Sequence, residues 1–265
     1  MEARPDLTVV TGASRGIGRL FALHFAVAGH PVVAMARSSR DLDSLTEASG
    51  SITVLPADVT DPLAVRDAFA AANERFGPPT TVVMCAGSID ALGPVAEVDA
   101  DRWWAAVAVD LRGTMLVAQA AVRGMLQVGR GRIVTVYGNL GDRGAPNLSA
   151  FAAAKAGVAR LTETLANEVH GTGIVVLGIH PGFVRTPMTE QLAWGDDGKR
   201  WTPRFGSHAE KSWGDGDTAV ALLDQITAGD ADRLVGRILH AGDDIAALAE
   251  QAATDVDRRR LRLLP

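Results

Sequence analysis

The chain has 265 residues, of which 47% are hydrophobic, and its formal net charge is −5 at pH 7. This length and apolar content suit one buried core, so we expect a single domain over residues 1–265. The acidic balance argues against nucleic acid and anionic membranes as partners, because both attract basic surfaces.

Cys85 is the only cysteine, which excludes an internal disulfide and suits a reducing compartment. The first residues lack the basic and apolar regions of a signal peptide, and we expect no window of about 20 apolar residues. These observations predict a cytoplasmic protein with no membrane partner.

Short apolar runs alternate along the chain with segments of helical period. Buried strands are expected at 7–10, 31–36, 52–55, 81–85, 133–137, 174–179 and 234–239. Helices are expected at 17–29, 40–49, 61–76, 101–128, 149–170, 216–228 and 243 to about 263, whereas the polar stretch 186–216 fits neither pattern. The alternation predicts an α/β fold, a Rossmann-type doubly wound parallel sheet with helices on both faces.

A glycine-rich turn joins the first strand to the first helix, with the sequence Thr11-Gly12-Ala13-Ser14-Arg15-Gly16-Ile17-Gly18. Glycines let the backbone turn sharply and approach a pyrophosphate, and the helix N-terminus offers free N–H groups. A strand before the turn and a helix after it are the context that dinucleotide binding requires. We therefore expect this turn to hold a dinucleotide.

The turn resembles the Thr-Gly-x-x-x-Gly-x-Gly fingerprint of the short-chain dehydrogenase/reductase family, and the resemblance extends along nearly the whole chain. Asp58-Val59 is similar to the family's adenine-contacting pair, and Cys85-Ala86-Gly87 is similar to its Asn-Ala-Gly turn. Pro181-Gly182 followed by Thr186 resembles the segment that closes over the nicotinamide end. The resemblance implies a cofactor site formed by Gly12, Ser14, Arg15, Gly16, Ile17, Gly18, Arg37, Ser38, Asp58, Val59, Cys85, Ala86, Gly87, Lys155, Pro181, Gly182 and Thr186.

The end of the second strand bears on the choice of nucleotide. A carboxylate there would accept hydrogen bonds from the ribose hydroxyls of NAD(H) and repel the 2′-phosphate of NADP(H). This chain instead has Arg37 and Ser38 at that point, and Arg15 lies within the glycine turn. Two guanidinium groups suit a dianionic phosphate, and in the family these two places mark NADP(H) preference. We favour NADP(H); the alternative is that both arginines are solvated surface residues.

The resemblance also implies a catalytic Tyr, a Lys four residues later on the same helix face, a Ser thirteen residues before the Tyr, and an Asn on the preceding helix. Lys155 is present, but Phe151 is at the Tyr position, Gly138 at the Ser position and Asp110 at the Asn position. Losing a general acid costs about 10²–10⁴ in rate, and losing a donor to the substrate oxygen costs roughly 10²–10³. An ordinary ketone reductase with these residues would be severely impaired.

Four residues are candidates for chemistry at this end of the site. Lys155 is expected to hold the nicotinamide ribose, as the resemblance implies. Asp110 is either a new acid or base or an isosteric replacement of Asn, and Asn139 and Asp142 are either substrate-binding groups or turn residues. Tyr137 is expected to pack in the core or against the cofactor, and no metal-ligand spacing occurs in the sequence.

The stretch 186–216 contains Trp194, Trp201, Phe205 and Trp213. In the family this region forms the substrate lid, so the resemblance implies an apolar or polycyclic small-molecule substrate. The alternative is an aromatic cluster that fixes this stretch to the body or to another subunit. Trp104 lies in the helix 101–128, which packs against a neighbouring subunit in relatives, so the resemblance implies a homo-oligomer, either a dimer or a tetramer.

Three functions fit these observations. The first is an atypical NADP(H)-dependent oxidoreductase in which the substrate or water supplies the proton, as with a conjugated enone or a quinone. The second is a non-redox enzyme that uses the same cleft for isomerisation, dehydration or cyclisation. The third is a catalytically inactive binding partner of an active relative.

Overall fold

The computed structural model describes residues 6–138, 141, 143–258 and 260–261. Within this part of the chain, seven strands form one parallel sheet in the order β3-β2-β1-β4-β5-β6-β7. The strands are β1 (Thr8–Thr11), β2 (Val32–Ala36), β3 (Ile52–Pro56), β4 (Thr81–Met84), β5 (Gly131–Val136), β6 (Ile174–His180) and β7 (Ile238–His240). The expected α/β fold with a doubly wound parallel sheet is confirmed.

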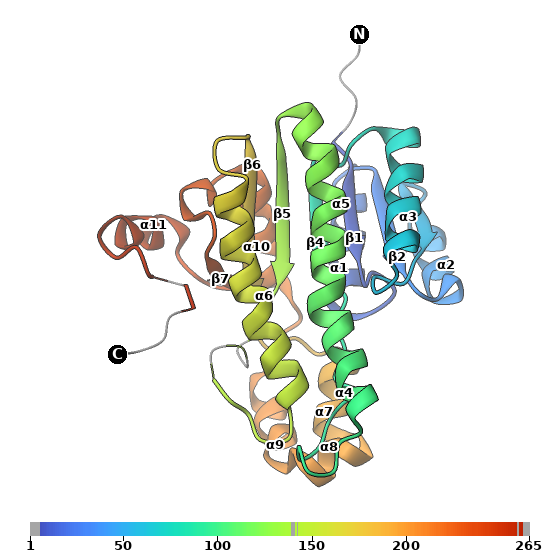
Figure 1. Ribbon diagram of the computed structural model, residues 1–265, viewed down its shortest axis with the longest axis vertical. Coiled ribbons are helices and arrows are strands. Elements are labelled where there is room, and N and C mark those ends of the chain that lie inside the picture. The colour runs from blue at the N-terminus through green and yellow to red at the C-terminus, as the bar shows by residue number, and fades with distance from the viewer. Residues whose placement is uncertain (1–5, 139–140, 142, 259, 262–265) are drawn as a thin grey trace.

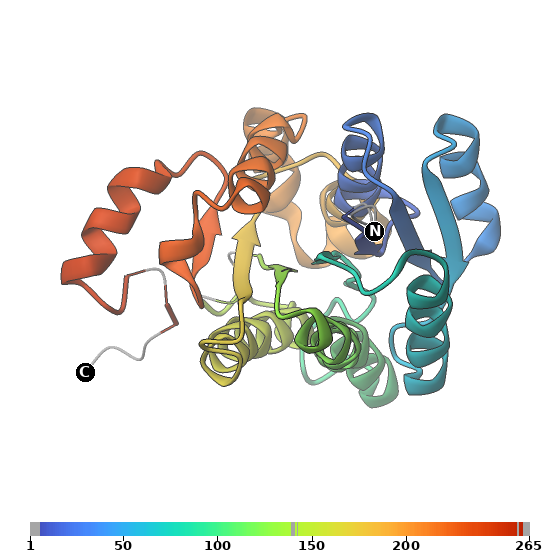
Figure 2. The ribbon, with the colours of Figure 1, turned by 90° about the horizontal axis from the view of Figure 1, so that it is seen from above.

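Helices cover both faces of the sheet (Figure 2). They are α1 (Gly16–Val27), α2 (Ser39–Ala48), α3 (Pro62–Phe76), α4 (Ala100–Val107), α5 (Gly113–Val128), α6 (Ser149–Glu168), α7 (Pro187–Trp194), α8 (Asp196–Trp201), α9 (Pro203–Ser212), α10 (Asp217–Ala228) and α11 (Ile245–Thr254). Apolar residues of α1, α2, α10 and α11 pack on one face, and those of α3, α5 and α6 pack on the other. Burial of both faces explains why the strand sequences are continuously apolar.

The strand order reverses direction between β1 and β4, since β2 and β3 lie on one side of this pair and the later strands lie on the other. Ligands of doubly wound sheets bind outside the carboxyl ends of the strands at this reversal. Helices α7, α8 and α9 lie beyond that same end of the sheet (Figure 1). The fold therefore places the glycine turn and the stretch 186–216 around one position.

The expectation that 186–216 lacks regular structure was wrong, because most of it folds into α7, α8 and α9. Thr186 begins α7 with a capping box, in which its hydroxyl accepts from Thr189 N and Thr189 Oγ1 accepts from Thr186 N. Pro187 and Pro203 occupy first-turn positions, where a missing N–H costs nothing. These start signals are local, but helices this short become stable only by packing on the rest of the protein.

The single helix expected at 101–128 is interrupted. A π-helical turn at Ala108–Arg112 separates α4 from α5. The segment Ala100–Val128 is also long enough to cross a membrane and contains an 18-residue window with a mean hydropathy of 1.4, which corrects the expectation that no such window exists. Alanine and valine give this apolarity, and 44% of the window is buried within the protein. In the fold α5 packs on the sheet beside α3, as the core helix of a doubly wound protein does.

The C-terminal elements are shorter than expected. The last strand was expected at 234–239, but a 3-10 turn occupies Asp232–Leu234 and β7 is Ile238–His240. Gly236 explains the shift, because its positive φ of 78° breaks the strand before Ile238. Helix α11 ends at Thr254 rather than near 263. Its last buried apolar residue is Ala252, so the helix ends where its apolar face ends.

Candidate functional site

A cavity of about 370 Å³ lies at the carboxyl ends of β1, β4 and β5. Every residue that the sequence predicts for the cofactor lines it, from the glycine turn to Thr186. These residues come from separate strands and loops, and the sheet brings them together. The cavity also has apolar and lid residues in its wall: Phe151, Phe183, Met188, Leu192 and Phe205.

The glycine turn approaches the strand beside it so closely that side chains would not fit. A Cβ on Gly12, whose φ is +64°, would lie 2.7 Å from Ala86 N. A Cβ on Gly18 would lie 2.8 Å from the carbonyl carbon of Gly12. Glycine at these positions therefore lets the turn pack closely on the neighbouring backbone, and Gly12, Gly16 and Gly18 line the cavity without a Cβ between the backbone and a ligand.

Helix α1 begins at this turn without a side-chain cap. Its N-cap residue is Arg15, whose side chain makes no capping hydrogen bond. The first N–H groups of a helix have no partner within the helix, and the positive end of the helix dipole lies there. The turn, the uncapped helix and the long cavity together fit a dinucleotide whose phosphates lie at α1.

Arg15 and Arg37 supply positive charge at the same end. Both are exposed, both line the cavity, and neither forms an ion pair with another described residue. Ser38 is already engaged, since its hydroxyl caps α2 by accepting from Asp41 N at 3.3 Å. Asp58 Oδ1 accepts from Thr60 N and Thr60 Oγ1, each at 2.8 Å, which fixes the carboxylate in a turn at the cavity wall.

An ion pair lies at the inner end of the cavity. Lys155 Nζ is 2.9 Å from Asp110 Oδ1 and donates to the carbonyl oxygen of Val136 at 3.0 Å. Asp110 Oδ2 accepts from Ser88 N at 2.9 Å. Asp110 is 1% exposed and lies behind Gly87, so it reaches the cavity through Lys155, which lines the cavity.

The π-helical turn positions this pair. Asp110 is the central residue of Ala108–Arg112, and its carbonyl oxygen accepts from Thr114 Oγ1 at 2.6 Å. A π-helical turn inserts an extra residue into a helix and often occurs at functional sites. Here it carries the carboxylate of Asp110 toward the Ser88 backbone and the Lys155 ammonium group.

Phe151 and Gly138 form the wall next to Lys155. The Lys155 Nζ atom lies 5.4 Å from the centre of the Phe151 ring, within range of a cation–π interaction. A Cβ on Gly138 would lie 3.5 Å from that ring, an ordinary contact distance. The wall therefore has no hydroxyl at either position. Asn139 and Asp142, also predicted here, lie outside the described residues.

Two residues that drew attention in the sequence are placed as expected. The Tyr137 side chain is 2% exposed and packs with Ala159 and Ile238, as predicted for a core residue. Burial raises the pKa of the Cys85 thiol to about 12, and the Lys155 charge lowers it only in part. Cys85 is therefore a protonated thiol at neutral pH and not an activated nucleophile.

The aromatic residues of 186–216 divide between two places. Phe205 and Trp201 join Phe151 and Leu192 in one apolar cluster beside the cavity. Trp194 and Trp213 instead pack edge to face, 4.6 Å apart, under the guanidinium of Arg185. The first group is available to an apolar ligand, and the second fixes α7 to the end of α9.

The sequence did not single out several groups that the fold brings to the site. His180 lines the cavity, and its Nδ1 accepts from Gly182 N at 3.1 Å. Ser88 N holds Asp110, and Arg102 and Asp90 line an adjoining cavity. Only the position of Ser88, directly after the Cys85-Ala86-Gly87 turn, was a usable signal in the sequence.

Comparison with known proteins gives a consistent family. The family model described as short chain dehydrogenase matches residues 6–196. The chain is 36% identical over 193 residues to the short chain dehydrogenase mpl6 of Monascus purpureus, which covers 69% of this chain and 66% of that protein. It is 34% identical over 197 residues to 3-oxoacyl-(acyl-carrier-protein) reductase FabG of Thermotoga maritima, covering 72% of this chain and 79% of that protein. The chain thus spans slightly less than two thirds of the Monascus relative.

Solved structures agree in fold. An actinorhodin polyketide ketoreductase variant with NADPH has a TM-score of 0.80 and 26% identity, and the match covers 89% of this chain and 95% of that chain. Levodione reductase has a TM-score of 0.81 and 26% identity, with 93% of this chain and all of that chain covered.

Proposed function

Since this chain belongs to the short-chain dehydrogenase family, we propose that it is an NADP(H)-dependent oxidoreductase that reduces an apolar small molecule without a tyrosine proton donor. The observation that carries this proposal is the wall around Lys155. An ammonium group faces the cavity next to a phenyl ring, Phe151, that has no proton to give. The family implies a nicotinamide cofactor, and a structural neighbour has been solved with NADPH.

The residues present fit such a cofactor. The glycine turn and the first N–H groups of α1 would hold its phosphates, and Arg15 and Arg37 would meet a 2′-phosphate. When bound, the nicotinamide supplies or accepts a hydride. Lysine has three N–H donors, of which Lys155 uses one on the carbonyl oxygen of Val136, while its charge is paired with Asp110. A remaining donor can hold an oxygen of the ribose or of the substrate.

The proton sets the substrate class. Reduction of a ketone produces an alkoxide-like oxygen that needs an acid in place, which the family's Tyr supplies. Gly138 and Phe151 stand at the Ser and Tyr positions in our interpretation, so this acid is missing. A quinone or a conjugated enone takes up one hydride and one proton, and its hydroquinone or enolate oxygen can take the proton from water. Phe151, Leu192 and Phe205 would pack on such a ring.

Asp110 acts through Lys155 in this scheme and is a positioning residue. Its carboxylate fixes the ammonium group and balances its charge. The variant Asp110→Asn keeps an acceptor for Ser88 N but removes the charge. We expect kcat to fall at least about tenfold, while the KM changes little.

The test measures NADPH oxidation by absorbance with menadione and with an aryl ketone. Stoichiometric oxidation with the quinone, little with the ketone, and a lower kcat in Asp110→Asn would support the proposal. Product formation with no change in nicotinamide absorbance would contradict it and point to a non-redox enzyme. Binding of NADPH without turnover of either compound would favour a binding protein. Wild-type kcat in Asp110→Asn would remove Asp110 from the mechanism.

The nucleotide preference is tested separately. We expect NADPH to bind at least about tenfold more tightly than NADH, because a 2′-phosphate would meet Arg15 and Arg37. Arg37→Asp should narrow or invert this difference, whereas Arg123→Asp, a change at an exposed arginine of α5, should preserve it. Titration by fluorescence gives the affinities. Equal affinities in the wild-type protein would contradict NADP(H) preference.

We also propose a cytoplasmic location, a lid formed by residues 186–216 and a homo-oligomeric state, as predicted from the sequence. The lid proposal is supported by the position of α7 and α9, whose residues Met188, Leu192 and Phe205 line the cavity. A lid at this place excludes water from the ring of the substrate while the hydride is transferred.

A further inference from the structure

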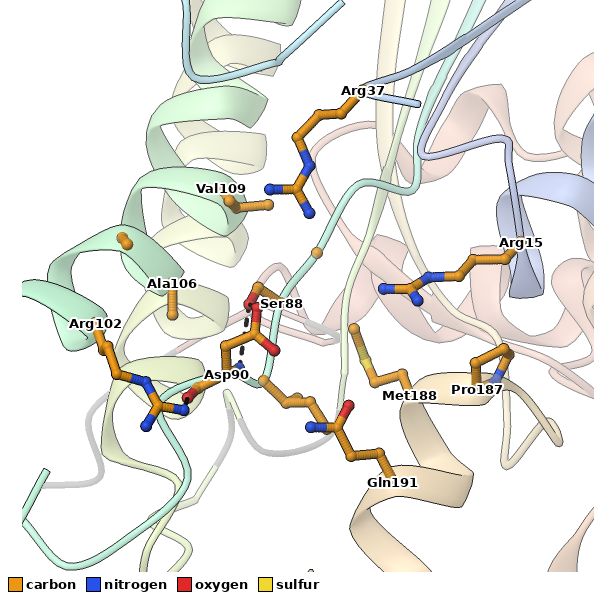
Figure 3. A pocket seen from close by; sticks show the side chains of 13 residues that line it. Arg15, Arg37, Ser88, Asp90, Arg102, Ala106, Val109, Pro187, Met188 and Gln191 are labelled. Atoms are coloured by element: carbon orange, nitrogen blue, oxygen red, sulfur yellow. Dashed lines mark hydrogen bonds between the residues drawn. The ribbon is translucent and has the colours of Figure 1, made fainter. Parts of the chain in front are cut away.

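A second cavity of about 270 Å³ adjoins the first. It lies between residues 87–90, helix α4 with the π-helical turn that follows it, and the first residues of α7 (Figure 3). The two spaces share a wall, because the same residues line both cavities: Arg15, Arg37, Gly87, Val109, Pro187 and Met188. A molecule that lies beside Lys155 can therefore extend past Met188 into the second cavity.

The second cavity has charged side chains in its wall. Arg15, Arg37 and Arg102 line it together with Asp90, and the Arg15 and Arg37 side chains point toward it from two sides (Figure 3). The Asp90 carboxylate accepts from Ser88 Oγ at 2.8 Å. Arg15 and Arg37 also line the first cavity, where a 2′-phosphate would engage them, so Arg102 and Asp90 are the charged residues that line the second cavity alone, and they form no ion pair with each other.

Arg102 has no part in the proposed nucleotide site, because it does not line the first cavity. Its Nη2 donates to the carbonyl oxygen of Asp90 at 2.6 Å, which fixes the side chain at the cavity edge. An arginine has five N–H donors in a planar fork that matches a carboxylate, sulfonate or phosphate. The donors not used on Asp90 are available to an anion other than the nucleotide.

An apolar wall connects this charge to the reaction site. Ile89 and Met188 line the second cavity and belong to the same apolar cluster as Phe151, Leu192 and Phe205. One ligand can therefore place a ring system against Phe151 and an acidic group near Arg102. Apolar packing would fix the ring, and the charge would fix its direction.

We propose that the second cavity binds an acidic group of the substrate, so that the substrate is an amphipathic anion with an apolar ring system. This inference rests on the proposed function in placing the ring beside Lys155. The acidic group is held by the guanidinium fork of Arg102, and the Asp90 carboxylate opposes it.

Two fluorescent probes with the same aromatic rings separate charge from apolar packing. Anilinonaphthalene sulfonate has an acidic group, and N-phenylnaphthylamine lacks it. In the presence of NADP⁺, we expect Arg102→Gln to weaken sulfonate binding about threefold to tenfold and to change the neutral probe less than twofold. Asp90→Asn should strengthen sulfonate binding, and Arg123→Gln is the control with the same change of net charge.

Equal effects of Arg102→Gln on both probes, or no effect on the sulfonate, would overturn the proposal. Inorganic phosphate should compete no better than chloride at equal ionic strength, and displacement by millimolar phosphate would instead indicate a site for a free anion. The titrations are repeated without NADP⁺. If Arg102→Gln still weakens sulfonate binding without NADP⁺, the acidic-group site is supported even if nucleotide binding or turnover fails. The two proposals are therefore tested independently.

Discussion

Two opposite charges, Asp110 and Lys155, are buried at the inner end of the candidate site. Burying a charge is costly unless it is paired and hydrogen-bonded. Removing one member of a buried pair typically costs about 3–5 kcal/mol, because the other charge stays behind. Each charge also has one backbone hydrogen bond: Ser88 N donates to Asp110, and the carbonyl oxygen of Val136 accepts from Lys155. For this reason Asp110→Asn, which keeps an acceptor, is a better probe of function than Asp110→Ala.

Cys85 gives a pH-dependent prediction at the same scale. Burial raises its pKa to about 12, whereas a thiol in an unfolded chain ionises near 8.5. Above about pH 8.5 the unfolded chain therefore gains stability by losing a proton that the native protein keeps. The free energy of unfolding therefore keeps its full value below about pH 8.5 and falls as the pH rises toward 12. At pH 10 the loss amounts to about 1–2 kcal/mol.

The measurement is urea denaturation at pH 7.5 and pH 10 for the wild-type protein and Cys85→Ala. The free energy of unfolding should fall more steeply with pH in the wild-type protein than in the variant. Because Cys85 is the only cysteine, the thiol signal is unambiguous. An equal fall in both proteins would contradict the raised pKa of the Cys85 thiol.

At the scale of elements, the junction of β1 and α1 shapes the cofactor end of the cavity. A Cβ at Gly18 would press on the Gly12 carbonyl, and the positive φ of Gly12 sets the direction of the chain. Alanine is a better helix former than glycine by about 1 kcal/mol, so propensity alone would favour Gly18→Ala. The steric contact reverses this preference.

We predict that Gly18→Ala lowers the free energy of unfolding by about 1–3 kcal/mol and weakens NADPH binding at least about tenfold. The reason is that the added methyl group displaces the turn from which the N–H groups of α1 reach the phosphates. Gly50→Ala is the matched control, because a Cβ there meets nothing within 4 Å. Chemical denaturation and nucleotide titration measure the two effects. A Gly18→Ala protein as stable as the Gly50→Ala protein would contradict the close approach.

At the scale of the whole molecule, exposed apolar side chains are concentrated on α4 and α5. Trp104 is 64% exposed, Leu126 is 50% exposed, and Met115 and Val128 are also open to solvent. Met115 and Leu126 are eleven residues apart in α5, which is close to three turns, so they lie on one side of the helix. Contiguous exposed apolar surface commonly marks an interface.

We predict that a second copy of this chain covers this face, as the family resemblance implies. Sedimentation velocity should show a dimer or larger species for the wild-type protein. The double change Trp104→Glu and Leu126→Glu should shift it toward the monomer by burying charge in the interface. Leu63→Glu, at an exposed leucine in the first turn of α3, is the control and should not change the species. A monomeric wild-type protein, or a double variant with unchanged sedimentation, would contradict the prediction.

The sequence by itself determined the fold class and the glycine turn, because both depend on local features. Apolar runs such as 81–84 and the helical period of 17–27 show in short windows, and a positive φ at Gly12 needs only the residue type. The ends of helices and strands predicted from the sequence were wrong where local signals competed. Examples are Gly236 in the expected last strand and the capping box of Thr186 in the expected loop.

Only the tertiary structure decided which groups share the site. Asp110 and Lys155 are 45 residues apart, yet the π-helical turn and α6 bring their charged atoms to 2.9 Å. Arg102 shares a cavity with Arg15 and Arg37 because the strand order places the loops after β1, β2 and β4 side by side. Sequence periodicity indicates which side of an element is buried, but not which distant element it meets. Contacts across the sheet depend on strand order and packing, and these belong to the folded chain as a whole.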